Sequence, residues 1–284
     1  MNRPRPKFAT AIGALSLALI QPDAFADELQ AQSQNPVASL VSLPIESSAN
    51  FEAGPSDENA YSTLIKPVYP AKLSENWNLI NRFIAPVIYL EGQDAVGAPD
   101  ASFELGGSEV FPGSSSEFGL GNLQYQAFFS PARPGKLIWG FGPAFELPTN
   151  TDKKLGSDTW SAGFSAVGLT IQGSWVVGLL LQNIWDIYSE SGEPDVNRAT
   201  VQPILNYNLD NGWYLSATTT IGANWEADSG NEWTVPLGGG AGRLVRFGKQ
   251  PVDFKLMAFS NVEKPKFGPE WSIQFTVKFL FPKS

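Results

Sequence analysis

Residues 271–281 read WSIQFTVKFLF, and this segment decides the fold. Large apolar and polar side chains alternate along it without a break, which is the period of a β-strand whose two faces differ. The apolar face carries Trp271, Ile273, Phe275, Val277 and Phe279, and the polar face carries Ser272, Gln274, Thr276 and Lys278. So much apolar surface on one face needs a partner that excludes water, because hydrating it costs free energy.

Two architectures supply such a partner. In a soluble β-sandwich the apolar face packs on a second sheet, whereas in a membrane β-barrel it meets lipid and the polar face lines the lumen. The period of the side chains does not distinguish these architectures. The connection lengths, the aromatic positions and the C-terminal residues favour the barrel.

Strand candidates occupy most of the chain after about residue 60. Segments rich in aromatic and β-branched residues alternate with clusters of Gly, Pro, Asn, Asp and Ser, and no segment keeps a helical period. Eleven candidates are clear: 61–72, 77–90, 118–130, 136–147, 160–170, 175–188, 197–209, 213–224, 232–247, 251–262 and 270–281. A weaker segment around residues 39–51 is the expected twelfth strand, because bacterial single-chain barrels have an even number of strands.

Short and long connections alternate between these candidates. Short turns are expected at residues 74–76, 132–135, 172–174, 210–212 and 248–250. Longer polar links are expected at residues 92–117, 148–159, 189–197, 224–231 and 263–270. Periplasmic turns and extracellular loops of a closed barrel produce this alternation, because every second connection faces the outside.

Aromatic residues lie where the two membrane interfaces of such a barrel would be. Tryptophans stand at or near the predicted strand ends: Trp77, Trp160, Trp175, Trp185, Trp213, Trp225, Trp233 and Trp271. The last strand ends in Phe279-Leu280-Phe281, as outer-membrane barrels commonly do for their assembly machinery, although three residues follow it.

The N-terminus has the pattern of a secretory signal. Arg3, Arg5 and Lys7 precede an apolar run over residues 8–20, and Ala24-Phe25-Ala26 is a small-residue cleavage site. The run is shorter than the roughly 20 residues that a spanning helix needs. We therefore expect a signal peptide over residues 1–26, a flexible periplasmic lead over residues 27–38 and a barrel over residues 39–284. The expected location is the outer membrane of a Gram-negative bacterium.

The composition excludes several kinds of chemistry. The chain contains no cysteine and no histidine, so it has no disulfides, no thiolate or imidazole metal ligands and no Ser-His-Asp relay. Its formal net charge is −9, and no stretch rich in Lys and Arg could bind a phosphate backbone. Nucleic acid is therefore not an expected partner.

A set of short motifs resembles one known family. They are NPVA at 35–38, SLP at 42–44, WNLI at 77–80, GFGP at 140–143, LPT at 147–149, QPILNY at 202–207, NWEADSG at 224–230, WTVPLGGG at 233–240 and GKQPV at 248–252. Together they resemble the meta-pathway phenol-degradation family of transporter-like outer-membrane proteins, whose bacterial members sometimes carry the misnomer neuromedin U. The resemblance covers nearly the whole mature chain. It implies a barrel and a role in moving small molecules, aromatic ones among them, and it carries no catalytic residues over.

If the bulky residues face lipid, a mixed-sign set of polar side chains faces the lumen: Glu146, Gln182, Asp186, Gln202, Asn206, Ser216, Thr218, Asp253, Lys255, Gln274, Thr276 and Lys278. These groups would shape a narrow aqueous path that selects solutes by size and charge, or would only pair with one another to fill the interior. Barrels of about eight strands are filled by side chains and those of about sixteen or more leave a channel, so the expected strand number leaves both options open.

Other motifs resemble parts of calcium-binding and phosphate-binding loops. Residues 228–232 and 150–152 resemble fragments of calcium loops, but their spacing fits no EF-hand and acidic links of this kind are usually solvated. The glycine runs at 119–121 and 238–240 open no helix, which favours strand bends or bulges over phosphate cradles. A bulge near residues 238–240 would also explain why Arg243 falls on the face of Trp233. We expect no catalytic residue, no metal and no cofactor.

The expected function is that of a passive outer-membrane channel or facilitator for small solutes, hydrophobic and aromatic ones included, without an enzymatic step. Its partners would be the solute, the lipid and lipopolysaccharide of the outer membrane, and the barrel-assembly machinery. Two alternatives stay open. One is a plugged structural or surface-interaction barrel without transport, and the other is an exported soluble β-sandwich that binds a ligand.

Overall fold

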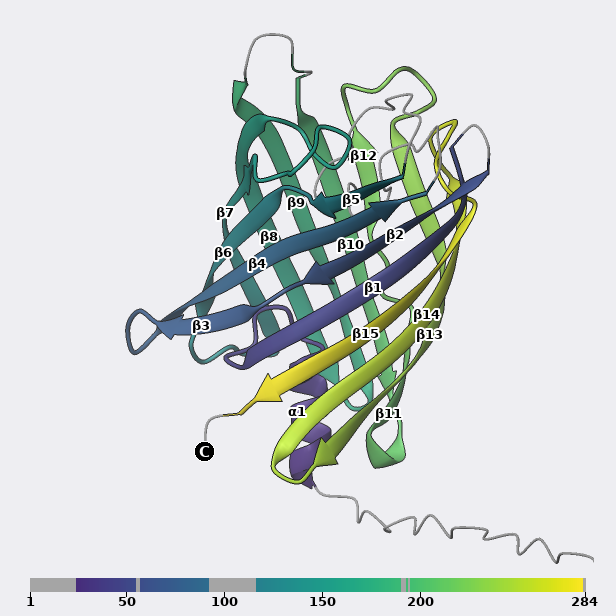
Figure 1. Cartoon of the computed structure of the whole chain (residues 1–284). Coiled ribbons are helices and arrows are strands. Elements are labelled where there is room, and N and C mark those ends of the chain that lie inside the picture. Colours follow the sequence, from purple (N-terminus) through teal and green to yellow (C-terminus); the bar gives the residue numbers. More distant parts are fainter. Residues whose placement is uncertain (1–23, 55–56, 92–115, 190–192, 194, 283–284) are drawn as a thin grey trace, which may run out of the picture.

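The chain folds into one antiparallel β-sheet that closes on itself (Figure 1). The structure is a computed structural model and describes residues 24–54, 57–91, 116–189, 193 and 195–282. The first strand pairs with the last, Val41 to Phe281 through Phe51 to Trp271, and this pairing closes the cylinder. The prediction of a closed barrel is confirmed, and the β-sandwich alternative is wrong, because the described sheet has no second sheet to pack on.

Helix α1 (Ala24–Ser33) precedes the sheet. The strands are β1 (Val41–Ala53), β2 (Glu58–Ile65), β3 (Val68–Lys72), β4 (Trp77–Leu90), β5 (Glu117–Leu120), β6 (Leu123–Pro131), β7 (Leu137–Leu147), β8 (Thr159–Gln172), β9 (Trp175–Ser189), β10 (Asn197–Asn208), β11 (Trp213–Ser216), β12 (Ile221–Asn224), β13 (Trp233–Phe247), β14 (Gln250–Glu263) and β15 (Trp271–Phe281), with a 3₁₀ turn η1 (Asp210–Gly212) before β11. No helix among the described residues is long and apolar enough to cross a lipid bilayer.

The 15 strands found in the described residues make 12 barrel strands, as predicted. Strands β2 and β3 both pair with β1 and β4, strands β5 and β6 both pair with β4, and strands β11 and β12 both pair with β10 and β13. Each couple is therefore one barrel strand with an interruption. The weak twelfth candidate is β1, whose partners are the C-terminal strand and β2.

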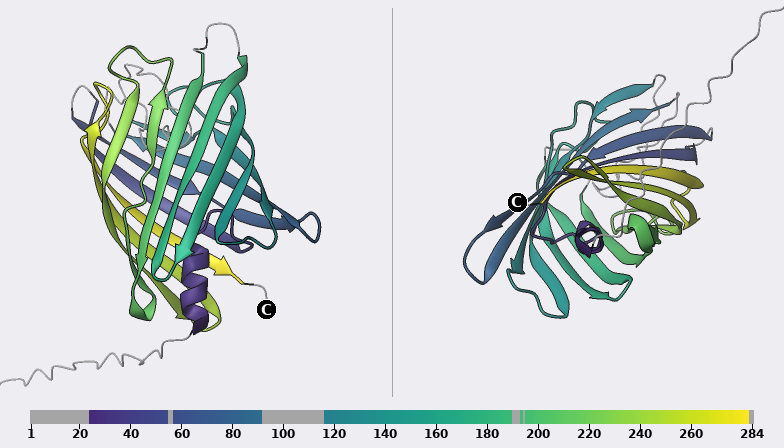
Figure 2. Two further views of the ribbon diagram at one scale, coloured as in Figure 1. Left: turned by 180° about the vertical axis from the view of Figure 1, so that it is seen from behind. Right: turned by 90° about the horizontal axis from the view of Figure 1, so that it is seen from below.

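Connection lengths divide the barrel into two ends (Figure 1). The short turns between β3 and β4, β6 and β7, β8 and β9, β10 and β11, and β13 and β14 gather at one end, which we call the short-turn end. Helix α1 and the C-terminal end of β15 lie at this end too, as both views in Figure 2 show. The longer links at 148–159, 224–231 and 263–270 lie at the opposite end, which agrees with the predicted alternation. Most of the expected link at 92–117 and part of the one at 189–197 lie outside the described residues.

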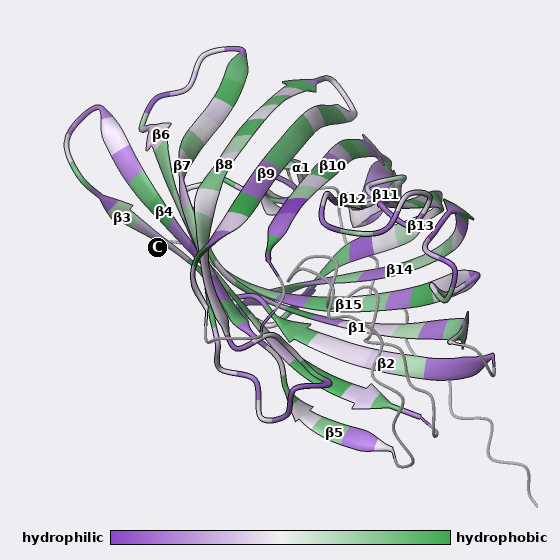
Figure 3. Ribbon diagram, turned by 90° about the horizontal axis from the view of Figure 1, so that it is seen from above, coloured by the Kyte–Doolittle hydropathy of each residue, from purple (hydrophilic) through white to green (hydrophobic). Residues whose placement is uncertain are grey.

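The outer surface of the barrel is apolar and the inner surface is mixed. On β15, Trp271, Ile273 and Phe275 are exposed on the outside, whereas Ser272, Thr276 and Leu280 are buried on the inside. The alternation of hydropathy along the strands is visible in Figure 3. An exposed apolar surface of this extent is unusual for a soluble protein, because water does not solvate it.

One prediction about β13 is wrong. Its register with β11 runs evenly from Trp213 opposite Arg243 to Ser216 opposite Gly240, so no bulge lies near the glycine run. Arg243 faces outward, with its guanidinium 5.1 Å from the centre of the Trp213 ring. The register of β13 with β14 shifts elsewhere, between Val235 and Pro236.

Candidate functional site in the barrel interior

The mouth of the barrel at the short-turn end holds the N-terminal segment. Helix α1 lies within the ring of strands when the barrel is viewed from this end (Figure 2). Residues 27–38 were expected to form a flexible lead, and this expectation is wrong, because Leu29, Val37 and Ala38 are buried against the barrel wall. We call residues 29–40 the plug. The expected signal peptide falls largely on residues outside the described part of the chain and stays a prediction.

Hydrogen bonds attach the plug to the hairpin of β10 and β11 and to β15. Gln30 Nε2 donates to the carbonyl oxygen of Trp213 at 2.8 Å, and Gln34 Nε2 donates to Asn208 Oδ1 at 2.7 Å. Lys278 Nζ donates to the carbonyl oxygen of Ser33 at 2.7 Å. Ser33 ends helix α1, where main-chain carbonyls carry a partial negative charge, so a lysine is favoured there.

Apolar contacts hold the plug between opposite walls. Val37 belongs to a buried cluster with Ile80, Phe128, Val167, Leu169, Val176, Leu180 and Ile204. Leu29, Ala38 and Leu40 form a second cluster with Leu244 of β13 and Leu280 of β15. The sequence signal for this was small, since the plug residues are mostly polar and their few apolar side chains show no clear period.

Cavities follow one another along the interior and become smaller. A mouth cavity of about 660 Å³ lies between α1 and the turns of β6 to β9. Beyond residues 33–40 lies an inner cavity of about 150 Å³, and a third of about 60 Å³ shares Glu46, Gln202 and Lys255 with it. A fourth, of about 20 Å³ and lined by Arg82, Gln126 and Gln182, has room for about one water molecule. We call this smallest of the four cavities the waist.

The structure places all of the residues predicted for the lumen on inward-facing positions. The inner cavity is lined by Gln202, Asn206, Thr218, Asp253, Lys255, Thr276 and Lys278, the third cavity by Gln274, and the waist by Gln182. Glu146 and Ser216 are buried inside the wall. Asp186 accepts a hydrogen bond from the main-chain nitrogen of Val196 at 3.0 Å, so it supports a connection.

Many inward positions are apolar, which the expected polar lumen did not include. Ile80, Ile84 and Ile88 of β4 are buried on the inside, as are Leu180 of β9 and Ile204 of β10. The interior therefore offers apolar surface beside polar groups. The sequence pattern did not reveal these positions. An inward Ile on a strand whose outer face is also apolar gives the two faces the same hydropathy.

One side of the interior is filled by buried polar groups that hydrogen-bond to one another. Arg198 Nη2 lies 2.8 Å from Glu146 Oε1, and both side chains are almost fully buried. Asn122 and Gln124 also donate to the Glu146 carboxylate, at 3.4 and 3.1 Å. We call these four residues the Glu146 network. Nearby, Gln126 of β6 donates to Gln182 of β9 and so bridges strands that are not neighbours.

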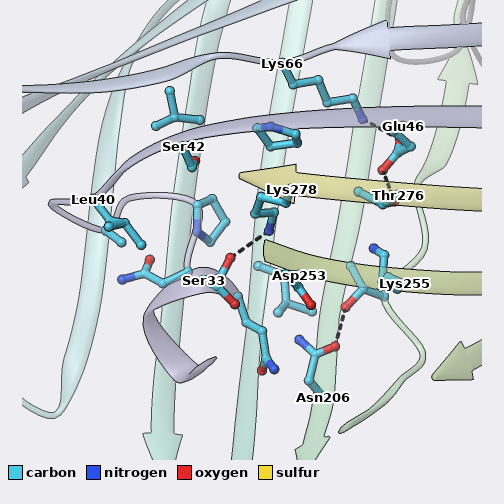
Figure 4. A pocket seen from close by; sticks show the side chains of 18 of the residues that line it. Ser33, Leu40, Ser42, Glu46, Lys66, Asn206, Asp253, Lys255, Thr276 and Lys278 are labelled. Carbon is cyan, nitrogen blue, oxygen red and sulfur yellow. Dashed lines mark hydrogen bonds and ion pairs between the residues drawn. The ribbon is translucent and has the colours of Figure 1, made fainter. Parts of the chain in front are cut away.

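The opposite side of the interior, around the inner cavity, is charged (Figure 4). Lys66 Nζ lies 2.6 Å from Glu46 Oε1, and Tyr214 donates to the Asp253 carboxylate at 3.0 and 3.1 Å. Arg82 and Lys255 line the same cavity.

Sequence reasoning missed Glu46, Lys66 and Tyr214. The sequence alone does not decide whether Arg82 or its polar neighbour Asn81 faces the lumen. One sequence signal could have identified Glu46 as an inward residue. It is a charged residue in a segment whose opposite face is apolar. In the structure Asn81 faces the outer side, where it accepts a hydrogen bond from Tyr125 at 2.7 Å. Arg82 donates inward to Gln126 at 3.3 Å.

At the far end, the β7–β8 link folds back onto the barrel. Leu155 is buried in a cluster with Leu64, Ile84 and Ile88. The Asn150 amide donates to Asp158 Oδ1 at 3.2 Å, so part of the suspected calcium loop is an internal hydrogen-bonded turn. Lys153 lies 2.7 Å from Glu193 and 3.3 Å from Asp158, and these hydrogen bonds raise the pKa of its ammonium group. Among the described residues no cluster of Asp and Glu could hold a metal ion.

No family model matches the chain, and no curated protein matches it. Solved structures do. The COG4313 outer membrane channel from Pseudomonas putida F1 is 17% identical, with a TM-score of 0.59 over 86% of this chain and 96% of that chain. A Pseudomonas aeruginosa FadL homologue is 10% identical, with a TM-score of 0.45 over 88% and 93% of the two chains.

The toluene transporter TodX from P. putida is 10% identical, with a TM-score of 0.41 over 86% and 90% of the two chains. Of these similarities, the one to the COG4313 channel is close enough to bear on the fold. It agrees with the barrel described above.

Proposed function

We propose that this chain is a passive channel or facilitator for small solutes in the outer membrane of a Gram-negative bacterium. The observation that carries the proposal is the row of cavities that leads from the short-turn end past the plug to the waist. Solutes would diffuse along this row without a chemical step. Hydrophobic and aromatic solutes are included, because apolar side chains such as Ile84, Leu180 and Ile204 face the interior.

The membrane placement is supported by the outer surface. Phe141, Phe164 and Leu256 are more than half exposed there, and a closed sheet leaves no unpaired edge in the lipid. The C-terminal aromatic strand and the N-terminal signal pattern support export to the outer membrane. Lipid, lipopolysaccharide and the barrel-assembly machinery are the partners that follow. If the placement holds, the protein stays with the membrane until detergent extracts it, whereas release by osmotic shock alone would contradict it.

The names of the similar structures agree with this proposal. The COG4313 protein is named an outer membrane channel and TodX a toluene transporter, and the resemblance of the sequence motifs to the meta-pathway phenol-degradation family points to the same class of cargo. We include membership of that family in the proposal.

The plug favours a second candidate, a closed structural barrel. Residues 29–40 fill the mouth through buried apolar contacts and hydrogen bonds, and the waist has room for about one water molecule. In the channel proposal the plug moves or the waist widens while a solute passes. In the structural alternative neither happens.

Liposome swelling separates the two candidates. Purified protein is placed in vesicles that are then diluted into isotonic solutions of uncharged solutes of increasing size. A channel makes the vesicles swell, and the rate falls as the solute grows. Vesicles with the barrel that swell no faster than empty ones would support the structural alternative. Heat-dependent migration in gels shows that the barrel is folded in each preparation.

A further inference from the structure

The inner cavity carries more positive than negative charge. Its lining includes four cationic side chains, Lys66, Arg82, Lys255 and Lys278, against the two carboxylates of Glu46 and Asp253. This excess is opposite in sign to the chain as a whole, whose formal net charge is −9. The interior of an acidic protein thus gathers cations in one place.

Both carboxylates already have partners. Glu46 accepts from Lys66 at 2.6 Å and from Thr276 at 3.4 Å. Asp253 accepts from the Tyr214 hydroxyl at 3.0 and 3.1 Å. Glu46 is paired with Lys66, whereas the Tyr214 hydroxyl is neutral and leaves the charge of Asp253 to attract Lys278 and Lys255. Asp253 can neutralise one of Arg82, Lys255 and Lys278, so a net positive charge remains on these three side chains.

These three side chains, which we call the cation cluster, have few partners of their own. Within the described residues, Lys255 has no hydrogen-bond or ion-pair partner, and Arg82 donates to Gln126 at 3.3 Å. Lys278 is attracted to Asp253 and Glu46 and repelled by Lys255 and Arg82, and Lys255 also interacts with both carboxylates. Like charges in a confined space repel more strongly than in water, so an anion placed among them would be stabilised.

Lys278 already binds an oxygen from the cavity side. Its ammonium donates to the carbonyl oxygen of Ser33 at 2.7 Å (Figure 4), and that oxygen carries the partial negative charge of a helix C-terminus. A carboxylate oxygen is a stronger acceptor than a carbonyl oxygen, since charge-assisted hydrogen bonds are the stronger class. The geometry at Lys278 therefore suits an anionic oxygen.

Apolar side chains complete the cavity. Leu40, Val68 and Ile204 line it beside the cations. The volume is about 150 Å³, and an apolar cavity of about that size is known to hold one benzene molecule. The occupant is therefore small, with an apolar body and one charged end.

We propose that the cation cluster binds a small organic monoanion, a carboxylate with a short apolar body. This inference deepens the proposed function and rests on it, because it names the class of solute that the path favours. The carboxylate would lie among Lys255, Lys278 and Arg82 and the apolar body against Leu40, Val68 and Ile204.

Binding is measured separately from transport, so that a failure of the anion-site proposal can be distinguished from a failure of the channel proposal. Three probes of similar size are titrated into the purified detergent-solubilised barrel and followed by ligand-observed NMR: benzoate, neutral benzamide and cationic benzylammonium. We expect benzoate to bind at least about tenfold more tightly than benzamide, which corresponds to about 1.4 kcal/mol, and benzylammonium to bind least. Inorganic phosphate as a fourth probe tests the apolar part of the site, and it should compete weakly.

Matched variants identify the cluster as the site. Lys255→Gln should abolish the preference for benzoate over benzamide, and Lys255→Arg should keep it. Lys136→Gln removes the same charge from an exposed turn and should leave the preference unchanged. Equal binding of benzoate and benzamide by the folded protein would overturn the inference, as would a Lys255→Gln variant that binds like Lys136→Gln. Benzoate binding without vesicle swelling would refute the channel and keep the anion site.

Discussion

The Glu146 network and the cation cluster lie in the same interior and differ in how their charges are neutralised. Glu146 has Arg198, Asn122 and Gln124 as partners within hydrogen-bond distance. Lys255 has no such partner among the described residues, and Lys278 uses a main-chain oxygen of the plug. Where polar groups satisfy one another, the interior is filled and structural. Where they do not, it is open to a plug or a solute.

The largest change should come from removing the plug. A chain that lacks residues 29–40 joins the mouth cavity to the inner cavity and frees Lys278 from Ser33. We expect the current through single barrels in a planar bilayer to rise several-fold. Glu28→Gln, which keeps the plug, is the control. An unchanged current would mean that the plug does not limit the path.

A large effect on stability should come from the Glu146 network. Arg198→Ala leaves Glu146 buried without its cationic partner, and loss of one member of a buried pair costs about 3–5 kcal/mol. We expect the urea midpoint of unfolding in lipid vesicles to fall accordingly. Lys255→Ala, on the other side of the interior, should leave that midpoint nearly unchanged. Equal losses in both variants would remove the distinction between the two regions.

A smaller effect should come from the waist. The double variant Gln126→Ala and Gln182→Ala removes the bridge between β6 and β9 and widens the point where about one water fits. The two amides are removed together, so neither is left facing an unpaired partner, but Arg82 and buried Ser165 lose the oxygens of Gln126 and Gln182 that they donate to. The stability should therefore fall by about 1–3 kcal/mol. The swelling rate for the larger uncharged solutes should rise. No change in that rate would place the limiting constriction elsewhere.

The smallest effect should come from the surface pairs of Lys153. Its ammonium is exposed and interacts with Glu193 and Asp158, which raise its pKa. The pairs contribute while Lys153 is protonated, so any contribution is lost as the pH rises through this raised pKa. We expect Lys153→Ala to leave the urea midpoint unchanged at neutral pH, because solvent screens such pairs. A clear loss would show that the β7–β8 link stabilises the barrel through its charges.

The strand pattern predicted the barrel because the outer face is apolar on nearly every strand and the turns alternate in length. The plug was not predictable in the same way. Its anchors Gln30 and Gln34 are ordinary polar residues in the sequence and gain their role from Trp213 and Asn208, which are distant along the chain. Lys66 was missed because it lies in the interruption between β2 and β3, outside any alternating run. The alternation of side chains between the two faces of each strand identified the inward residues. Only the tertiary contacts show which of these residues are partners.

The most direct test of the channel account is the ionic current that the purified full-length barrel carries across a planar bilayer under a salt gradient. The account predicts discrete current steps and a reversal potential that indicates selectivity for anions over cations. In Lys255→Gln the reversal potential should shift in the direction of weaker anion selectivity. A folded, inserted barrel that carries no current, with the plug present or removed, would contradict it.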